Sequence, residues 1–327
     1  MTHLSLGHGR EFDLLRAIYA RLGSAAAPLG DDCALVRVGG TTLAASIDAS
    51  LEGVHFRTDW LSFEEIGWRA AAAALSDLAA EGAKPIGMLV TLGVPDGGRG
   101  KGEGGRVRPD PATEIMAGVA AVAKTVGAKV LGGDLTRSER YLMDVCVLGT
   151  AERPVRRAGA RRGDGLWVTG RLGGARLALR SWEAGRRPEE PLARRFARPE
   201  PRVAAGRWLA ARGARAMIDV SDGLAADAAH LAAASGVAVE IALERVPCWP
   251  GVEPLAAAAS GEEYELLVAL PPAFGEPQAR AFVRRFRLPL TRIGACARGG
   301  GTGVRLTDRG VAVPPPAGYD HFAPSPA

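Results

Sequence analysis

Cysteine and aromatic residues are scarce in this chain of 327 residues. The four cysteines, Cys33, Cys146, Cys248 and Cys296, lie far apart and form no C-x-x-C pair, which argues against a structural zinc site and against a disulfide framework. Aromatic residues make up 6% of the chain and are not interleaved with its arginines. The net charge of +5 therefore favours a solvated arginine-rich surface over a nucleic-acid interface.

Long apolar runs are also missing. No stretch is apolar for long enough to span a bilayer, and Arg10, Glu11, Asp13 and Arg16 stand where a secretory signal would need an apolar core. We therefore expect no membrane association and a cytoplasmic location.

Two common catalytic motifs are absent as well. The chain has no G-x-S-x-G, so a serine hydrolase of that type is disfavoured. The Gly-rich stretch from Pro95 to Pro111 contains Lys101, but Gly102 follows it where a phosphate-binding P-loop needs Ser or Thr. We expect this stretch to be a surface excursion that does not pack.

The chain does contain alternating strand-like and helix-like segments. After a helix at 11–22, the spacing predicts strands at 42–48, 88–94, 129–131 and 142–148 and helices at 63–82 and 112–126. A second series has strands at 166–169, 216–220, 237–243, 265–270 and 290–296 and helices at 203–212 and 224–234. These patterns predict an α/β (α+β) protein with two mixed α/β domains, residues 1–151 and 152–327.

Aspartate recurs beside glycine or serine where apolar strands are expected to end. These positions include Asp32, Asp48, Asp134 and Asp219, and Asp77 lies in an Ala-rich helix. Taken singly, an Asp after Gly usually caps a helix or closes a turn. If the five carboxylates converge, however, their repulsion calls for cations, and hard oxygen ligands favour Mg²⁺.

Magnesium held by carboxylates points to phosphate chemistry. Phosphoryl transfer depends on neutralising and aligning a polyphosphate, so no side-chain nucleophile is required. His230 is interpreted as an ordinary helix residue. His55, just after the Asp48 strand, is the better functional candidate.

Seven blocks along the chain resemble the thiamine-monophosphate kinase family, in that family's order. They are GDDCA at 30–34, SID at 46–48 with GVHF at 53–56, LSDLAA at 75–80, GDLTR at 133–137, IDVSDGL at 218–224, SGEEYEL at 260–266 and GYDHF at 318–322. The last two separate this family from its relatives in the aminoimidazole ribonucleotide synthetase-like superfamily.

The resemblance implies an enzyme that transfers the γ-phosphoryl group of ATP directly and in line onto thiamine monophosphate, the last step of thiamine diphosphate biosynthesis. ATP is then a co-substrate, and several Mg²⁺ ions serve as cofactors. The resemblance also implies a homodimer in which strands of the N-terminal domain form a barrel across the two subunits.

The family motifs assign roles to individual residues of this chain. The implied magnesium ligands are Asp32, Ser46, Ile47, Asp48, Asp77, Asp134, Asp219 and Asp222. Gly133, Asp134, Arg157 and Ser221 would contact ATP, and His55, Glu262 and Tyr319 would contact thiamine monophosphate. Ile47 stands where the family often has Thr, so only its main-chain carbonyl remains as a ligand.

Several alternative interpretations of these residues and of the function are compatible with the sequence. Arg157 can be an exposed linker charge, Glu262 and Glu263 cannot be ranked by chemistry alone, and His321 competes with Tyr319. Another superfamily enzyme with a different acceptor would carry the same ATP motifs. A selenophosphate synthetase is disfavoured because it would want a reactive Cys near the N-terminus, and none precedes Cys33. A non-catalytic module that binds divalent metal or nucleotide is the alternative from a different class.

Overall fold

The computed structural model describes residues 9–27, 30–96, 110–297, 299, 301–319 and 321–322. The chain forms two compact units. The five-stranded unit comprises Cys33–Pro154 and Ala178–Arg207, and the seven-stranded unit comprises Met1–Asp32, Val155–Leu177 and Trp208–Ala327. The chain thus passes between the units after residues 32, 154, 177 and 207. The predicted division into residues 1–151 and 152–327 has a single boundary, and it stays a prediction.

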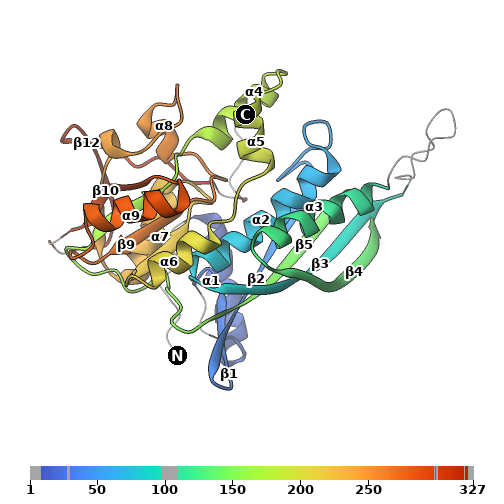
Figure 1. Cartoon of the computed structure of the whole chain (residues 1–327), viewed down its shortest axis with the longest axis horizontal. Coiled ribbons are helices and arrows are strands. Elements are labelled where there is room, and N and C mark those ends of the chain that lie inside the picture. Colours follow the sequence, from blue (N-terminus) through green and yellow to red (C-terminus); the bar gives the residue numbers. More distant parts are fainter. Residues whose placement is uncertain are drawn as a thin grey trace. The chain divides into compact units, whose positions relative to one another are not determined.

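The five-stranded unit is built on one mixed sheet with strand order β1-β2-β5-β3-β4 (Figure 1). Its strands are β1 (Ala34–Val38), β2 (Thr41–Leu51), β3 (Lys84–Pro95), β4 (Lys129–Ser138) and β5 (Leu142–Ala151). All neighbours pair antiparallel except β3 and β4, which run parallel. Helix α3 (Pro111–Thr125) makes the connection that a parallel pair requires.

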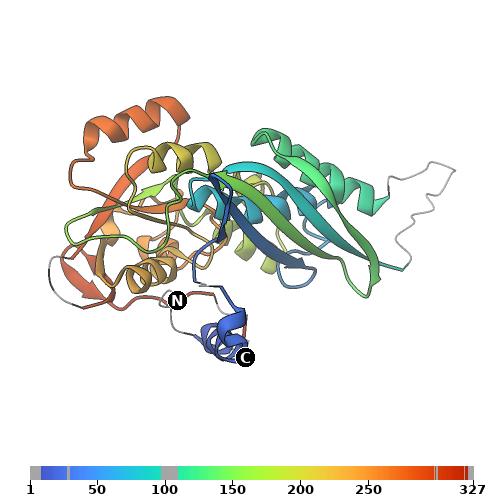
Figure 2. The ribbon, with the colours of Figure 1, turned by 90° about the horizontal axis from the view of Figure 1, so that it is seen from below.

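Two helices, α2 (Phe63–Ala80) and α3, cover one face of this sheet side by side (Figures 1 and 2). A capping box begins α2, because Ser62 and Glu65 exchange side-chain and main-chain hydrogen bonds. The helices cross with their backbones in close approach: a Cβ on Gly67 would lie 1.8 Å from the carbonyl oxygen of Ile115. The short helix α5 (Glu190–Ala197) also contacts α2.

The seven-stranded unit has strand order β12-β11-β8-β10-β6-β9-β7. In chain order its strands are β6 (Gly165–Thr169), β7 (Ala216–Asp219), β8 (Ala238–Ala242), β9 (Leu266–Leu270), β10 (Leu290–Cys296), β11 (Gly303–Asp308) and β12 (Val311–Val313). Only β8 and β11 pair in parallel. Helix α7 (Leu224–Ser235) contacts β7, β8, β9 and β11.

The core of the seven-stranded unit follows the alternation of its strands. Leu166 and Val168 of β6 join the apolar cluster that contains Leu231 of α7. Trp167 lies on the other face, where it packs edge-on against Phe274 at a centroid distance of 5.4 Å. Helix α9 (Glu276–Phe286) belongs to this aromatic group through Phe282. The remaining helices are α1 (Arg10–Leu22), α4 (Gly174–Glu183), α6 (Val203–Ala210) and α8 (Pro254–Ala258).

The predicted α/β class is confirmed, and the predicted elements lie close to those observed. One expectation was wrong. Asp48 and Asp134 do not follow strand ends but lie inside β2 and β4, because both strands extend beyond the short apolar runs that predicted them. Most of the Gly-rich stretch lies outside the described residues. Within the described part of the chain, no helix has both the length and the apolar character needed to cross a membrane.

Candidate phosphate and metal site

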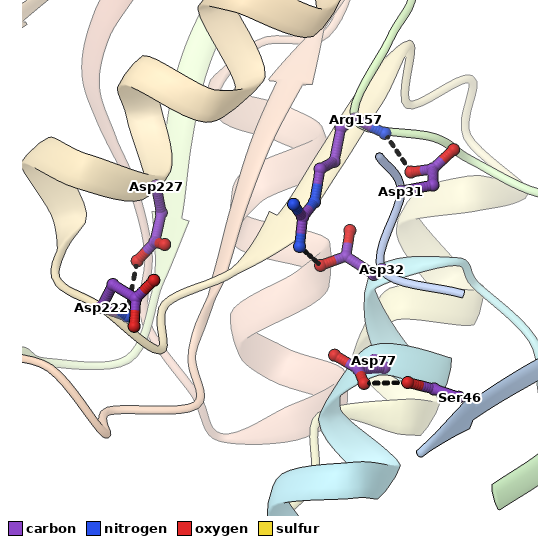
Figure 3. Close-up of polar contacts among 7 residues, drawn as sticks. All are labelled: Asp31, Asp32, Ser46, Asp77, Arg157, Asp222 and Asp227. Atoms are coloured by element: carbon purple, nitrogen blue, oxygen red, sulfur yellow. Dashed lines mark hydrogen bonds and ion pairs between the residues drawn. The ribbon is translucent and has the colours of Figure 1, made fainter. Parts of the chain in front are cut away.

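In the five-stranded unit, a hydroxyl and two carboxylates gather where β2 meets α2. Ser46 and Asp48 are two residues apart on β2, so their side chains project from the same face of the sheet. Helix α2 contacts β2 and supplies Asp77, whose Oδ2 accepts a 2.5 Å hydrogen bond from the Ser46 hydroxyl (Figure 3). The structure thus brings two of the predicted magnesium ligands, Ser46 and Asp77, into contact and places a third, Asp48, on the same face of β2.

Ile47 projects from the opposite face of β2 and is 67% exposed. Its position pairs with Cys146 of β5. Its side chain has no metal-binding atom, so any metal contact must use the main-chain carbonyl, as the sequence predicts.

Asp134 lies in β4, where its strand neighbours are Thr91 and, one strand further, Asp144. On β2, Asp48 pairs with Val145 of β5, the residue after Asp144, so Asp48 is not in the row that contains Asp134, Thr91 and Asp144. Because side chains alternate along strands, this register separates the Asp134 carboxylate from the contact between Ser46 and Asp77. The structure of the unit therefore does not add Asp134 to that group.

Gly133 is fixed by the neighbouring strand. A Cβ at this position would lie 1.8 Å from the carbonyl oxygen of Val90 on β3. Glycine is therefore required for close strand approach, and it leaves the main chain next to Asp134 uncovered by any side chain of its own.

His55 lies in the tight turn that follows β2. Its main-chain N–H donates to the Leu51 carbonyl at 2.9 Å, and its Nδ1 accepts from the Leu51 N–H at 3.1 Å. The hydrogen bond at Nδ1 fixes the orientation of the ring and assigns the ring proton to Nε2 when the imidazole is neutral.

In the seven-stranded unit, Arg157 is held by two neighbouring aspartates (Figure 3). Its main-chain N–H donates to Asp31 Oδ1 at 2.8 Å, and its guanidinium Nη2 donates to Asp32 Oδ1 at 2.9 Å. The Ser235 hydroxyl donates to the Arg157 carbonyl at 2.9 Å. Arg157 is thus anchored at three atoms, with its side chain 21% exposed, and is not a free linker charge.

A second aspartate group follows β7. Asp219 ends that strand, Ser221 and Asp222 form the turn, and Asp227 is fully enclosed in the first turns of α7. Asp227 Oδ2 accepts from the main-chain N–H of Asp222 at 3.3 Å (Figure 3) and from the main-chain N–H of Gly223 at 3.1 Å. These bonds shape the turn that carries Ser221 and Asp222.

These carboxylates strongly influence one another. Burial raises the pKa of Asp227 well above its usual value, and Asp222, Asp219 and Asp32 raise it further, whereas Arg157 lowers it. Burial and then Glu11 raise the pKa of Asp222 to about 6. Burial also raises the pKa of Asp31. The unit thus brings Asp32, Arg157, Asp219 and Asp222 into one electrostatic group that favours a bound cation or proton.

The two adjacent glutamates that the sequence left open differ in burial and in their hydrogen bonds. Glu263 is buried, and its Oε1 accepts from the Ser260 hydroxyl at 2.6 Å and from Gly173 N–H at 2.8 Å, at the start of α4. Glu262 is less buried and has a left-handed φ of 60°, stabilised by its N–H donating to the Ser221 carbonyl at 2.6 Å. Glu263 is therefore held by main-chain and hydroxyl donors, whereas Glu262 is less buried and lies in a left-handed turn.

Tyr319 is 56% exposed and lies beside the Asp222 turn. Its N–H donates to the Asp222 carbonyl at 3.2 Å, and its ring meets the His321 ring edge-on at a centroid distance of 4.8 Å. Burial, followed by the charges of Glu262 and Asp222, raises the pKa of Tyr319. The predicted substrate residues Glu262 and Tyr319 are thus neighbours, and His321 supports Tyr319.

Asp31 and Asp227 were not predicted as site residues from the sequence, although both lie next to predicted ones, since Asp31 bonds Arg157 and Asp227 bonds Asp222. The GDD pair at 30–32 and an Asp in the first turn of the helix after SDG were the available signals. His230 was interpreted as an ordinary helix residue, and it packs against Phe12 at a centroid distance of 4.5 Å.

Comparison with known proteins gives consistent matches. Two family models match: AIR synthase related protein, N-terminal domain, over residues 30–151, and AIR synthase related protein, C-terminal domain, over residues 161–307. A thiamine-monophosphate kinase of Mycobacterium tuberculosis (strain CDC 1551 / Oshkosh) is 35% identical over 65% of this chain, and that match spans 62% of the relative's own length.

Two further matches cover almost the whole chain. A thiamine-monophosphate kinase of Aquifex aeolicus (strain VF5) is 32% identical over 95% of this chain and 98% of its own. A solved structure described as AaThiL complexed with AMPPCP and TMP has a TM-score of 0.81 and 31% identity, covering 95% of this chain and 97% of the other.

Proposed function

The chain belongs to the thiamine-monophosphate kinase family, and we propose that it transfers the γ-phosphoryl group of ATP onto thiamine monophosphate, giving thiamine diphosphate and ADP. In this proposal the reaction is the last step of thiamine diphosphate biosynthesis. The carrying observation is the 32% identity over 95% of the chain to a thiamine-monophosphate kinase. The similar fold of a relative described with AMPPCP, an ATP analogue, and TMP supports the two substrates.

The donor set fits magnesium. Ser46, Asp48 and Asp77 offer oxygen ligands on one face of β2, and Asp32, Asp219 and Asp222 offer carboxylates around Arg157. Burial, followed by the Glu11 charge, raises the pKa of Asp222, so a bound cation would be favourable at this carboxylate. These residues and the main-chain carbonyl of Ile47 would hold the ions, whereas the metal role predicted for Asp134 is not retained, because its carboxylate projects from the other face of the sheet. Bound magnesium would neutralise and align the polyphosphate.

The chain's own residues then position the two phosphates for in-line transfer. Arg157 offers a forked guanidinium, Ser221 a hydroxyl, and Gly133 an uncovered main chain for contacts with ATP phosphates. The acceptor oxygen belongs to a phosphate that is already ionised, so no side-chain nucleophile or general base is required.

Acceptor recognition is assigned to His55, Glu262 and Tyr319. Glu262 offers a carboxylate suited to the aminopyrimidine ring, Tyr319 an exposed aromatic face for stacking, and His55 a fixed imidazole. Hydrogen bonds fix Glu263 and Asp227 around Glu262 and Tyr319 in the seven-stranded unit, and separately fix the His55 turn in the five-stranded unit.

We also propose a homodimer in which the five-stranded sheets of two copies form a barrel. Helices α2 and α3 cover one face of the sheet, while Ile47, Leu89 and Leu131 remain 67%, 41% and 50% exposed. Clustered apolar side chains of this kind are characteristic of protein interfaces. A cytoplasmic location, where ATP is available, completes the proposal.

The nearest alternative is a superfamily enzyme with the same ATP chemistry and another acceptor, and the next is a binding module without turnover. A single-turnover assay with Mg²⁺, ATP and thiamine monophosphate separates the three. The proposal expects thiamine diphosphate and ADP in equal amounts. ADP formed only with another acceptor would favour the first alternative, and binding without any ADP would favour the second.

A further inference from the structure

The N-terminal helix α1 has one charged residue on its covered side. Glu11, Phe12, Leu15 and Tyr19 are half-buried, whereas the other residues of the helix are exposed. Positions 11, 15 and 19 recur every four residues, so they form one helical face. A carboxylate on the covered face of an otherwise exposed helix calls for a polar partner.

The residues on either side of Glu11 are both anchored. Arg10 Nη1 donates to the Phe322 carbonyl at 3.3 Å, which ties α1 to the C-terminal segment. The Phe12 ring packs against His230 of α7, one helical turn after Asp227. These contacts hold Glu11 between the C-terminal segment and the start of α7.

That position is the neighbourhood of the proposed acceptor site. Phe322, whose carbonyl accepts from Arg10, is three residues after Tyr319, and His230, which packs against Phe12, is one helical turn after Asp227, so Glu11 lies near the Asp222 turn. Tyr319 is bonded through its N–H to the Asp222 carbonyl and presents an exposed ring there. Two glutamates thus lie in the neighbourhood of an aromatic ring, an arrangement that attracts a cation and repels an anion.

We propose that Glu11 is a specificity-determining residue of the acceptor site, where its carboxylate favours the permanently positive thiazolium ring of thiamine monophosphate over uncharged rings. This inference rests on the proposed function and extends its acceptor site to α1. The Tyr319 ring adds an aromatic face, which also favours a cationic partner. Because α1 and the C-terminal segment are joined by the Arg10 contact, both chain ends contribute to acceptor recognition.

The test compares a charged ligand with a neutral one. The probes are thiamine monophosphate and its analogue with an uncharged thiophene in place of the thiazolium. Dissociation constants are measured by calorimetry on the full chain with Mg²⁺ and AMPPCP, for the wild type, Glu11→Gln and Glu11→Asp. The control is Asp13→Asn, which removes the same charge from an exposed position on the same helix, paired with Arg16.

We expect Glu11→Gln to weaken thiamine monophosphate binding about fivefold to tenfold and to leave analogue binding within about twofold. Glu11→Asp should retain most of the preference for the charged ring, and Asp13→Asn should match the wild type. Equal weakening for both ligands would overturn the inference by showing that Glu11 only holds the helix, and unchanged binding of both would also overturn it. If the wild type makes thiamine diphosphate but Glu11→Gln does not change the preference for the charged ligand over the neutral one, the inference is refuted and the proposed function stands. A wild type that neither binds nor phosphorylates thiamine monophosphate refutes the proposed function, and the inference with it.

Discussion

The Arg157 guanidinium donates to Asp32 at 2.9 Å while the main-chain N–H of the same arginine donates to the adjacent Asp31. The Asp32 side chain is only 1% exposed, so this arginine compensates a carboxylate that water does not reach. One residue therefore links two neighbouring aspartates, and its guanidinium is a forked donor of the kind that binds phosphate.

Replacing this arginine tests its double role. Arg157→Gln should lower the free energy of unfolding by about 1–3 kcal/mol, because Asp32 loses its charged partner. It should also raise the KM for ATP, because Gln cannot donate as a charged fork. Urea denaturation and steady-state kinetics measure the two effects.

The adjacent Arg156 provides the control for that substitution. It is 53% exposed and lies 3.8 Å from Asp31, so Arg156→Gln should change the free energy of unfolding by less than about 0.5 kcal/mol. Equal effects of the two variants on stability and on the KM for ATP would contradict the assigned role of Arg157.

Stability of the metal-free protein should depend on Asp222. Its folded-state pKa of about 6 lies above the usual value of 3.8, so the folded protein holds an extra proton between these pH values. The free energy of unfolding should therefore fall as the pH rises through this interval, by about 3 kcal/mol for this group. At pH 7.5 in EDTA, Asp222→Asn should be more stable than the wild type, and this advantage should shrink near pH 4.5.

Chemical denaturation at the two pH values checks this dependence. Asp308→Asn, at an exposed position on β11, is the control and should not shift stability at either pH. Adding Mg²⁺ should stabilise the wild type more at pH 7.5 than at pH 4.5, since the cation competes with protons for the same carboxylates. A stability advantage of Asp222→Asn that is the same at both pH values would argue against a raised pKa.

The hydroxyl of Ser46 should matter for turnover more than for folding. Ser46→Ala removes the 2.5 Å bond to Asp77, and we expect kcat to fall about tenfold or more, with a loss of about 1 kcal/mol in unfolding free energy. Ser50→Ala, two residues beyond Asp48 on the same face of β2, is the control and should retain activity. Equal kcat values for Ser46→Ala and Ser50→Ala would show that the Ser46 hydroxyl has no role in turnover.

Gly133 should tolerate no side chain. The Cβ of Gly133→Ala would meet the Val90 carbonyl of β3, so the variant should lose about 2 kcal/mol or more of stability. Gly40→Ala, which has no atom within 4 Å of the added Cβ, should stay within about 0.5 kcal/mol of the wild type. If thermal melts give both variants the same melting temperature as the wild type, the described close approach of β3 and β4 would be contradicted.

The open face of the five-stranded sheet should carry the dimer. Leu89→Glu places a charge among its exposed apolar side chains, and light scattering after gel filtration should shift from dimer mass to monomer mass. Val311→Glu, at a 69% exposed position of the seven-stranded sheet, should leave the mass unchanged. A wild type that is monomeric at micromolar concentration would refute the dimer directly.

Much of the fold was predictable because its local signals agree with the final structure. Apolar periodicity located α2 and α3, and the Ala-rich composition and Asp110–Pro111 start of α3 are ordinary helix signals. Strand lengths were not predictable, since β2 and β4 contain Ser, Gly and Asp that favour strand ends elsewhere. Register decided that Asp134 lies in the Thr91 row, and periodicity does not encode register between distant strands.

The candidate site was predictable in its residue types and less so in its supporting contacts. The clustered Asp residues indicated divalent cations and phosphate without reference to coordinates. By contrast, the roles of Asp31, Asp227 and Glu263 depend on hydrogen bonds to main-chain N–H groups of other segments, and only the folded chain brings these together. Such partners have no fixed spacing in the sequence.

The transfer reaction itself is the most direct test of this account. The full chain is incubated with Mg²⁺, thiamine monophosphate and ATP labelled at the γ-phosphate, and the label is located by chromatography and phosphorus NMR. We predict that it appears in the terminal phosphate of thiamine diphosphate, with one ADP formed per label transferred, and that Asp48→Asn lowers the rate by orders of magnitude while leaving the fold intact. Label found only in free phosphate, or no loss of label from ATP, would contradict the account.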